Sequence, residues 1–206
     1  TYAVVDSRLT LSMPASVTAS TGFDALSQAI ESFWSVRHNP TSDIHALRAI
    51  PLIIQSLKRA VDHSGDLEAR SSMALAATEA GLAIAHTATT AVHSVSYPIT
   101  TYFGVPHGHA CALTLSSFID FNQDAFPEGR EKVLWNALQC KNAREASEKV
   151  DALMTGTGLE RRLSRLGIDK PGIETIVKNG FRPDRVKNNP RELTQAELEK
   201  ILLRIF

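Results

Sequence analysis

The sequence predicts an all-α fold, in which one multi-helix domain spans residues 15–206 and follows a short strand-like segment at residues 1–14. Three observations support this prediction. Apolar residues recur at steps of three and four along most of the chain, capping residues with prolines and glycines separate these runs, and strand-like alternation is almost confined to the first dozen residues. A chain of 206 residues can also bury a substantial core.

The first predicted helix lies within residues 18–36 and follows the corner at Pro14. Its apolar residues form one stripe on a helical surface, and its N-terminal cap is expected among Thr18, Ser20 and Thr21. The stripe consists of Phe23, Leu26, Ile30, Phe33 and Trp34.

Two longer helices are predicted next, over residues 39–63 and 67–88. The first of these starts behind a Thr41–Ser42–Asp43 cap, and Pro51 is expected to kink or interrupt it. Residues 64–66 (Ser-Gly-Asp) open the second, whose many alanines allow close packing on several sides.

Shorter helices are predicted for the remainder of the chain. One covers residues 89–97 and ends at Tyr97, because the residue before a proline is disfavoured in the α conformation. An apolar helix follows Gly108 through residue 122, and amphipathic helices fill the region after residue 128. Thr194 and Glu197 form a capping box that opens the final helix.

Composition excludes several classes of function. Lys+Arg and Asp+Glu both number 22, and no basic patch appears, so we expect no nucleic-acid partner. No stretch approaches the roughly 20 apolar residues of a membrane helix, so we expect no membrane partner. Two cysteines are too few for a disulfide framework and are typical of the reducing cytoplasm. No Gly-rich phosphate motif occurs, so no residue of this chain is assigned to nucleotide binding.

Four side chains form a candidate metal site. His93 and His107 stand in a mostly apolar stretch, and Asp24 and Gln28 share one face of the first predicted helix. A metal site needs three or four N or O ligands that converge from different elements. Asp24, His93 and His107 meet this need in ligand type, with Gln28 as a candidate fourth.

Other interpretations of these residues stay open at this stage. An isolated histidine in an apolar run is more often a hydrogen-bonded core residue than a ligand. Cys111, close after His107, is interpreted as core packing. Glu31 either supports the site from behind or belongs to a solvated helix face.

Three stretches resemble a known family. "TGFDALSQAIESF" resembles the Thr-Gly-x-Asp-Ala-Leu-x-His-Ala-Ile-Glu signature of the iron-containing (group III) alcohol dehydrogenases. "VHSVSYPITTYFGVPHGHACAL" resembles their second signature, in which two histidines stand fourteen residues apart and the later one lies in Pro-His-Gly. "NPRELTQAELEKILLRIF" is similar to the family's C-terminal end. The Ser-Tyr-Pro in the second stretch and "IESFWS" are most similar to the phosphonoacetaldehyde reductase branch.

The resemblance implies a fold and a domain arrangement. The chain would be the helical half of a dehydroquinate synthase-like architecture. Residues 1–14 would be the stub of a preceding dinucleotide-binding domain that lies outside this chain and binds most of the NAD(P)H. The isolated chain is then expected to be inactive, and the full-length protein to form a homo-oligomer.

The resemblance also implies an activity. The full-length enzyme would interconvert a small alcohol and aldehyde, with Fe²⁺ or Zn²⁺ as a Lewis acid. Asp24, His93 and His107 would be ligands, while Gln28 replaces the family's second ligand histidine and binds more weakly. Tyr97, which replaces a further histidine, and His109 would contact the substrate or deliver a proton.

Two alternatives stay open. The protein could be a metal-free or pseudoenzyme homologue because of Gln28. It could instead be a helical structural or interaction domain, in which case His93 and His107 would lie far apart.

Overall fold

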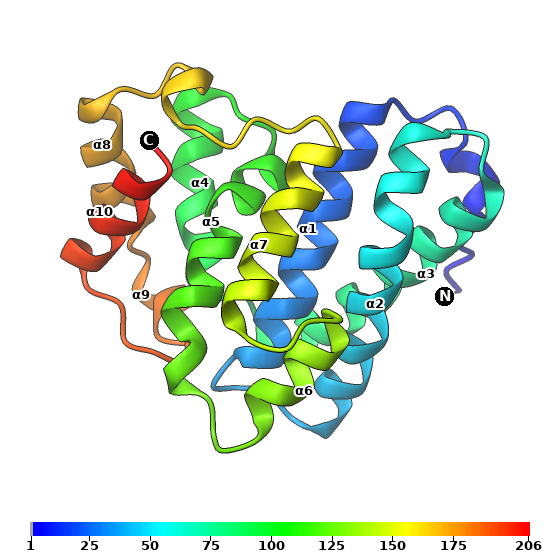
Figure 1. The fold of residues 1–206 in the computed structure, drawn as a ribbon, viewed down its shortest axis with the longest axis horizontal. Helices are drawn as coiled ribbons and strands as arrows, with labels where there is room; N and C mark the ends of the chain where they lie inside the picture. Colours follow the sequence, from blue (N-terminus) through cyan, green and yellow to red (C-terminus); the bar gives the residue numbers. More distant parts are fainter. Residues whose placement is uncertain (1) are drawn as a thin grey trace.

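The computed structural model describes residues 2–206, and all regular elements in that range are helices (Figure 1). The α-helices are α1 (Ala15–Trp34), α2 (Pro40–Asp62), α3 (Leu67–Thr87), α4 (Ala91–Phe103), α5 (His107–Asn122), α6 (Arg130–Ala137), α7 (Ala143–Gly156), α8 (Lys170–Gly180), α9 (Pro183–Val186) and α10 (Gln195–Arg204). Short 3-10 helices are η1 (Ser7–Thr10), η2 (Gln123–Ala125) and η3 (Ser164–Leu166). The predicted all-α fold class is confirmed.

The segment before α1 contains no strand within residues 2–14. Residues 2–6 run without regular structure, and η1 follows them. Val4 and Val5 are 89% and 60% exposed, so these strand-forming side chains face mainly solvent. An isolated strand leaves its backbone hydrogen-bonding groups unpaired. This explains why the strand-like composition of this segment does not produce a strand here. Thr1 lies outside the described residues.

Helix α1 is the central element of the fold. Helices α2 and α3 pack on one side of it and α4 and α5 on the other (Figure 1). The predicted stripe is buried throughout, from Phe23 to Trp34. Burial also extends to polar positions such as Ser27 and Glu31, because helices surround α1 instead of covering a single face. A buried carboxylate such as that of Glu31 must therefore find its partners within the protein.

Two predicted helix starts are wrong by a few residues. Helix α1 begins directly after Pro14, and Thr18 lies inside it with its hydroxyl donating to the Pro14 carbonyl. Helix α2 begins earlier than its predicted cap. The side chain of Asn39 accepts from the amides of Thr41 and Ser42, and the Ser42 hydroxyl accepts from the Asn39 amide. The local sequence offers several competent caps, and tertiary packing selects among them.

Prolines do not end the helices that contain them. Pro51 lies within continuous α2, and α4 continues past Pro98 to Phe103, so the predicted end at Tyr97 is wrong. Gly104 instead ends α4 in the left-handed conformation, at φ 69°. Burial explains the continuation, because Pro98 packs closely against Gly180 at the end of α8. Packing outweighs the hydrogen bond that the proline removes.

The end of the chain follows its sequence signals closely. The hydroxyl of Thr194 accepts from the amide of Glu197, and the Glu197 carboxylate accepts from the amide and hydroxyl of Thr194. The predicted capping box is confirmed at the start of α10.

No helix within residues 2–206 has the length and apolar character needed to cross a bilayer.

Gly108 sets the distance between α1 and α5. A Cβ atom at this position would lie 1.9 Å from the backbone oxygen of Ser20 and 3.0 Å from the Cβ of Asp24. Any larger residue would push the two helices apart. This contact therefore brings the first turn of α5 against Asp24.

We expect Gly108→Ala to lower the free energy of unfolding by about 1–3 kcal/mol or more, since backbone atoms obstruct the added methyl group. Urea denaturation measures this loss. Gly81→Ala is the matched control, because Gly81 lies within α3 with no atom within 4 Å of its added Cβ. The control should be neutral or stabilise by about 1 kcal/mol. Equal effects of the two substitutions would contradict the close approach.

Candidate metal centre

Four potential ligand atoms converge where α1, α4 and α5 meet. Asp24, His93, His107 and Cys111 each offer one such atom, and all four atoms lie within 4.8 Å of one another. Asp24 Oδ1 lies 3.2 Å from His93 Nε2 and 3.6 Å from His107 Nε2. Cys111 Sγ lies 3.9 Å from His107 Nε2. The structure thus brings together three of the four residues predicted as ligands and adds a cysteine.

The position of each ligand residue within its helix directs its side chain toward the cluster. His93 lies in the first turn of α4, where its side chain points back toward α1. His107 is the first residue of α5, and Cys111 follows it one turn later on the same face. The Gly108 contact brings this face of α5 against Asp24.

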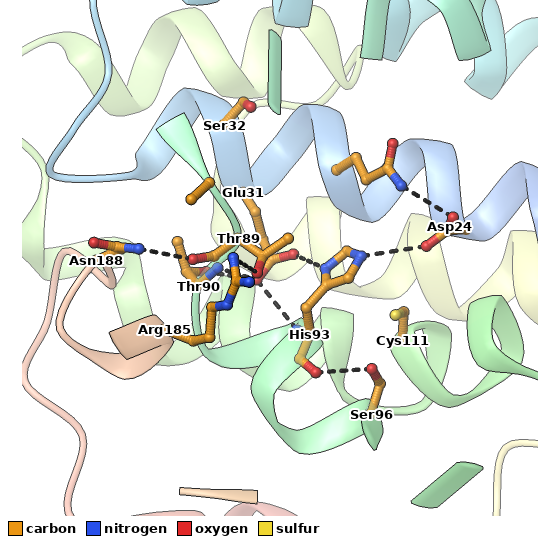
Figure 2. A network of polar contacts seen from close by, with 12 residues as sticks. Asp24, Glu31, Ser32, Thr89, Thr90, His93, Ser96, Cys111, Arg185 and Asn188 are labelled. Atoms are coloured by element: carbon orange, nitrogen blue, oxygen red, sulfur yellow. Dashed lines mark hydrogen bonds and ion pairs between the residues drawn. The ribbon is translucent and has the colours of Figure 1, made fainter. Parts of the chain in front are cut away.

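The carboxylate of Glu31 holds His93 from behind. It is fully buried, and its Oε2 accepts a hydrogen bond from Nδ1 of His93. Its Oε1 accepts from the amide and hydroxyl of Thr90, at 2.9 and 2.6 Å, and from the amide of His93 at 3.3 Å. Figure 2 shows the His93 ring between Glu31 and Asp24. A proton on Nδ1 leaves Nε2 as the nitrogen that faces Asp24 and can bind a metal.

The loop before α4 is fixed from several directions. Trp34 Nε1 donates to the Thr90 hydroxyl. Asn188 donates to the Thr89 carbonyl, and Arg185 donates to the Thr89 hydroxyl (Figure 2). Ala88 has φ 58°, in the left-handed half of the backbone map that a residue with a side chain rarely adopts. Such strain persists where surrounding contacts hold the backbone in place.

Electrostatic coupling ties the two histidines to the cysteine. Burial disfavours a charged His93, but the negative charges of Glu31 and Cys111 raise the pKa of His93 well above its usual value. A hydrogen bond with Cys111 raises the pKa of His107. Burial alone would disfavour the Cys111 thiolate, yet the positive charge of His93 and the contact with His107 lower the pKa of this thiol. The cluster thus favours the anionic form of its sulfur.

Gln28 contacts the cluster as a hydrogen-bond donor. Its Nε2 lies 3.0 Å from Asp24 Oδ2, and a carboxylate oxygen only accepts. The amide therefore turns its nitrogen toward Asp24 and fixes that carboxylate. This contact differs from the predicted role of Gln28 as a weak ligand.

The two residues predicted to contact substrate lie in different environments. Tyr97 stacks on the His107 ring, with centroids 5.8 Å apart, and lines a cavity beside the cluster. His109 is buried and donates from Nε2 to the Glu160 carbonyl at 2.7 Å. The structure does not bring His109 to this cavity, because the second residue after His107 points to another side of α5.

The cavity beside the cluster has a volume of about 460 Å³. His93 and His107 line it together with Tyr97, and Arg37 and Arg185 contribute positive charge. The side chain of His107 is 39% exposed and that of His93 only 3%, so the cluster opens to the cavity mainly at His107. A small anionic molecule could enter here and reach the imidazoles.

The donor set fits a divalent transition metal. A tetrahedral ion with bonds of about 2.0–2.3 Å separates its ligand atoms by roughly 3.3–3.8 Å. The separations of 3.2, 3.6 and 3.9 Å at the cluster are close to this range. Carboxylate, imidazole and thiolate are all ligands of Fe²⁺ or Zn²⁺. The residues present can therefore hold such an ion.

The sequence interpretation assigned Cys111 to core packing and left two interpretations of Glu31 open. Cys111 lies one helical turn after His107, a spacing that places both on one face and could have indicated a shared site. Glu31 lies seven residues after Asp24, on nearly the same face of α1. The sequence carries no sign that this glutamate is buried, so the choice between support and solvated face required the structure.

Comparison with known proteins identifies relatives along nearly the whole chain. Residues 18–206 match the model described as "Fe-containing alcohol dehydrogenase family, C-terminal". Long-chain-alcohol dehydrogenase 1 of Geobacillus thermodenitrificans is 32% identical over 97% of this chain and 52% of its own length. NAD-dependent methanol dehydrogenase of Bacillus methanolicus is 30% identical over 98% of this chain and 55% of its own.

A solved structure shows the same arrangement of helices. The sulfoacetaldehyde reductase of Bifidobacterium kashiwanohense, in complex with NAD⁺, aligns with a TM-score of 0.92 and 36% identity. The match covers 97% of this chain and 53% of that one. The chain thus spans about half the length of the relatives that it matches.

We expect Glu31→Ala to lower the free energy of unfolding by about 3–5 kcal/mol, because it leaves buried donors of Thr90 and His93 without an acceptor. Thermal or urea unfolding measures the change. Glu174→Ala, at an exposed position of α8, is the control and should stay within about 0.5 kcal/mol. A loss at Glu31 no larger than at Glu174 would show that this carboxylate does not organise the site.

Proposed function

This chain belongs to the Fe-containing alcohol dehydrogenase family, and we propose that it forms the metal- and substrate-binding part of an NAD(P)-linked oxidoreductase that interconverts a small alcohol and its aldehyde. The observation that carries the proposal is the convergence of Asp24, His93 and His107 from three helices. Their separation in sequence makes a chance cluster of such ligand types unusual. The relatives' names describe alcohol and aldehyde chemistry with NAD.

In this proposal Asp24, His93 and His107 hold Fe²⁺ or Zn²⁺. Such an ion supplies Lewis acidity, which polarises a substrate oxygen and stabilises negative charge on it. Glu31 keeps the Nδ1 proton of His93 in place, so that Nε2 stays free to bind. Gln28 orients the Asp24 carboxylate through its amide nitrogen.

Tyr97 and His107 form the wall along which the substrate would lie. Their stacked rings border the cavity, and the Tyr97 hydroxyl is the candidate for a hydrogen bond to the substrate. The dinucleotide would bind mainly to a part of the protein outside residues 1–206, since this chain contains no Gly-rich phosphate motif.

The substrate we propose is a small aldehyde that carries an anionic group, with phosphonoacetaldehyde as the candidate. Arg37 and Arg185 line the same cavity as the two histidines. Within the described residues, Nε of Arg185 is buried without a hydrogen-bond partner, although the Asp184 carboxylate lies 3.3 Å away. An oxyanion would satisfy such a donor. The similar sulfoacetaldehyde reductase is named for a small aldehyde with a sulfonate group.

The alternative of a helical interaction domain has less support. It expects the two histidines to be separate core residues, but the rings of His93 and His107 lie 5.4 Å apart and share a carboxylate. The metal-free alternative is an outcome of the metal measurement below.

We expect the full-length enzyme to bind one divalent ion per chain, and His93→Ala plus His107→Ala to abolish that binding and the activity. The loss should exceed the roughly 10–100-fold typical of partners that only support a ligand. Metal analysis of protein purified without oxygen or chelator measures this, with turnover measured in parallel. His63→Ala, at an exposed position, is the control.

Gln28→His separates the remaining outcomes. Metal in both proteins would support a metal enzyme that tolerates glutamine. Metal only in the variant would favour the metal-free alternative. Full activity of the double histidine variant would contradict the proposed function.

We expect Arg185→Ala to reduce kcat/KM for phosphonoacetaldehyde about 10–150-fold, which corresponds to about 1.5–3 kcal/mol for a charge-assisted hydrogen bond. The effect on acetaldehyde, which lacks the anionic group, should be much smaller. Arg48→Ala, at an exposed arginine paired with Glu79 on α3, controls for a general loss of charge. Equal losses for both aldehydes would contradict recognition of the anion by Arg185.

A further inference from the structure

Cys111 occupies a position within the metal cluster that the proposed function leaves without a role. It follows His107 by one turn of α5, and its side chain is fully buried. Its sulfur is one of four potential ligand atoms that lie within 4.8 Å of one another. Figure 2 shows Cys111 beside His93. The other cysteine, Cys140, contacts the Leu138 carbonyl and belongs to no such group within residues 2–206.

The other nearby donors leave room for a fourth ligand. Asp24, His93 and His107 supply three atoms, and Gln28 turns its amide nitrogen, which cannot bind a cation, toward Asp24. Glu31 is engaged by Thr90 and His93 on the side of His93 that faces away from Asp24. Among these groups, only the sulfur of Cys111 faces the same point as the three expected ligands.

We propose that the thiolate of Cys111 is a fourth protein ligand, so that the centre binds its metal through one carboxylate, two imidazoles and one thiolate. This inference rests on the proposed metal site of Asp24, His93 and His107. Metal binding displaces the thiol proton, which passes to solvent, and forms the metal–sulfur bond without any change of oxidation state.

This assignment determines the charge balance of the centre and the metals that it favours. The Asp24 carboxylate and the Cys111 thiolate together balance the two positive charges of the ion. A thiolate is softer than an imidazole or an amide oxygen, so the site favours Zn²⁺ or Co²⁺ over hard ions such as Mg²⁺. The full burial of Cys111 keeps its sulfur from solvent, which limits oxidation.

Cobalt substitution tests the assignment. Co²⁺ bound to the full-length protein should show visible ligand-field bands together with a near-ultraviolet band from sulfur-to-cobalt charge transfer. Cys111→Ser should lose the charge-transfer band and bind Co²⁺ at least about 10-fold more weakly. Cys140→Ser, which changes the cysteine outside the cluster, should keep both features.

The outcomes separate this inference from the proposed function. Ligand-field bands without charge transfer in the parent protein would overturn the role of Cys111 and leave the metal site intact. Failure of the parent to bind Co²⁺ or Zn²⁺ would overturn both.

A second measurement needs no variant and therefore does not depend on the folding of Cys111→Ser. X-ray absorption of the zinc-loaded parent should show one sulfur at about 2.3 Å beside nitrogen or oxygen at about 2.0–2.1 Å. A shell of nitrogen and oxygen alone would overturn the assignment.

Discussion

The buried carboxylate of Glu31 is the interaction on which the site depends. A negative charge inside a helical core is tolerated only where donors surround it. The amide and hydroxyl of Thr90 and the amide and ring of His93 supply those donors, and all of them lie at the start of α4. Satisfying this one charge fixes the start of α4 against α1 and directs the His93 ring toward Asp24 (Figure 2).

The second constraint is the close approach of α5. Because Gly108 has no side chain, the first turn of α5 rests on the backbone of Ser20 in α1. His107 and Cys111 then reach the group that α1 and α4 have already formed. Two independent packing conditions, one electrostatic and one steric, thus place ligands from three helices at a single point.

One side of the cluster is buried, and the other side is partly exposed. Cys111, His93 and Glu31 are buried, whereas Asp24 and His107 are partly exposed, and His107 lines the cavity together with Arg37 and Arg185. Under the proposed function, the buried side would keep the metal ligands ordered, and the exposed side would admit an anionic aldehyde. The positive charge of Arg37 and Arg185 would attract such a substrate, and burial strengthens each electrostatic contact near the ion.

The sequence by itself determined the helical class, the apolar stripe of α1, the capping box of α10 and three of the clustered residues, two of them through the spacing of the histidines. These features depend on local periodicity or on motifs that one segment carries. Tertiary structure decided the rest. Pro98 stays within α4 because α8 packs against it, and Glu31 is buried because helices surround α1. Cys111 meets His93 and Asp24 only because Gly108 lets α5 approach, and no single segment encodes such a distance between helices.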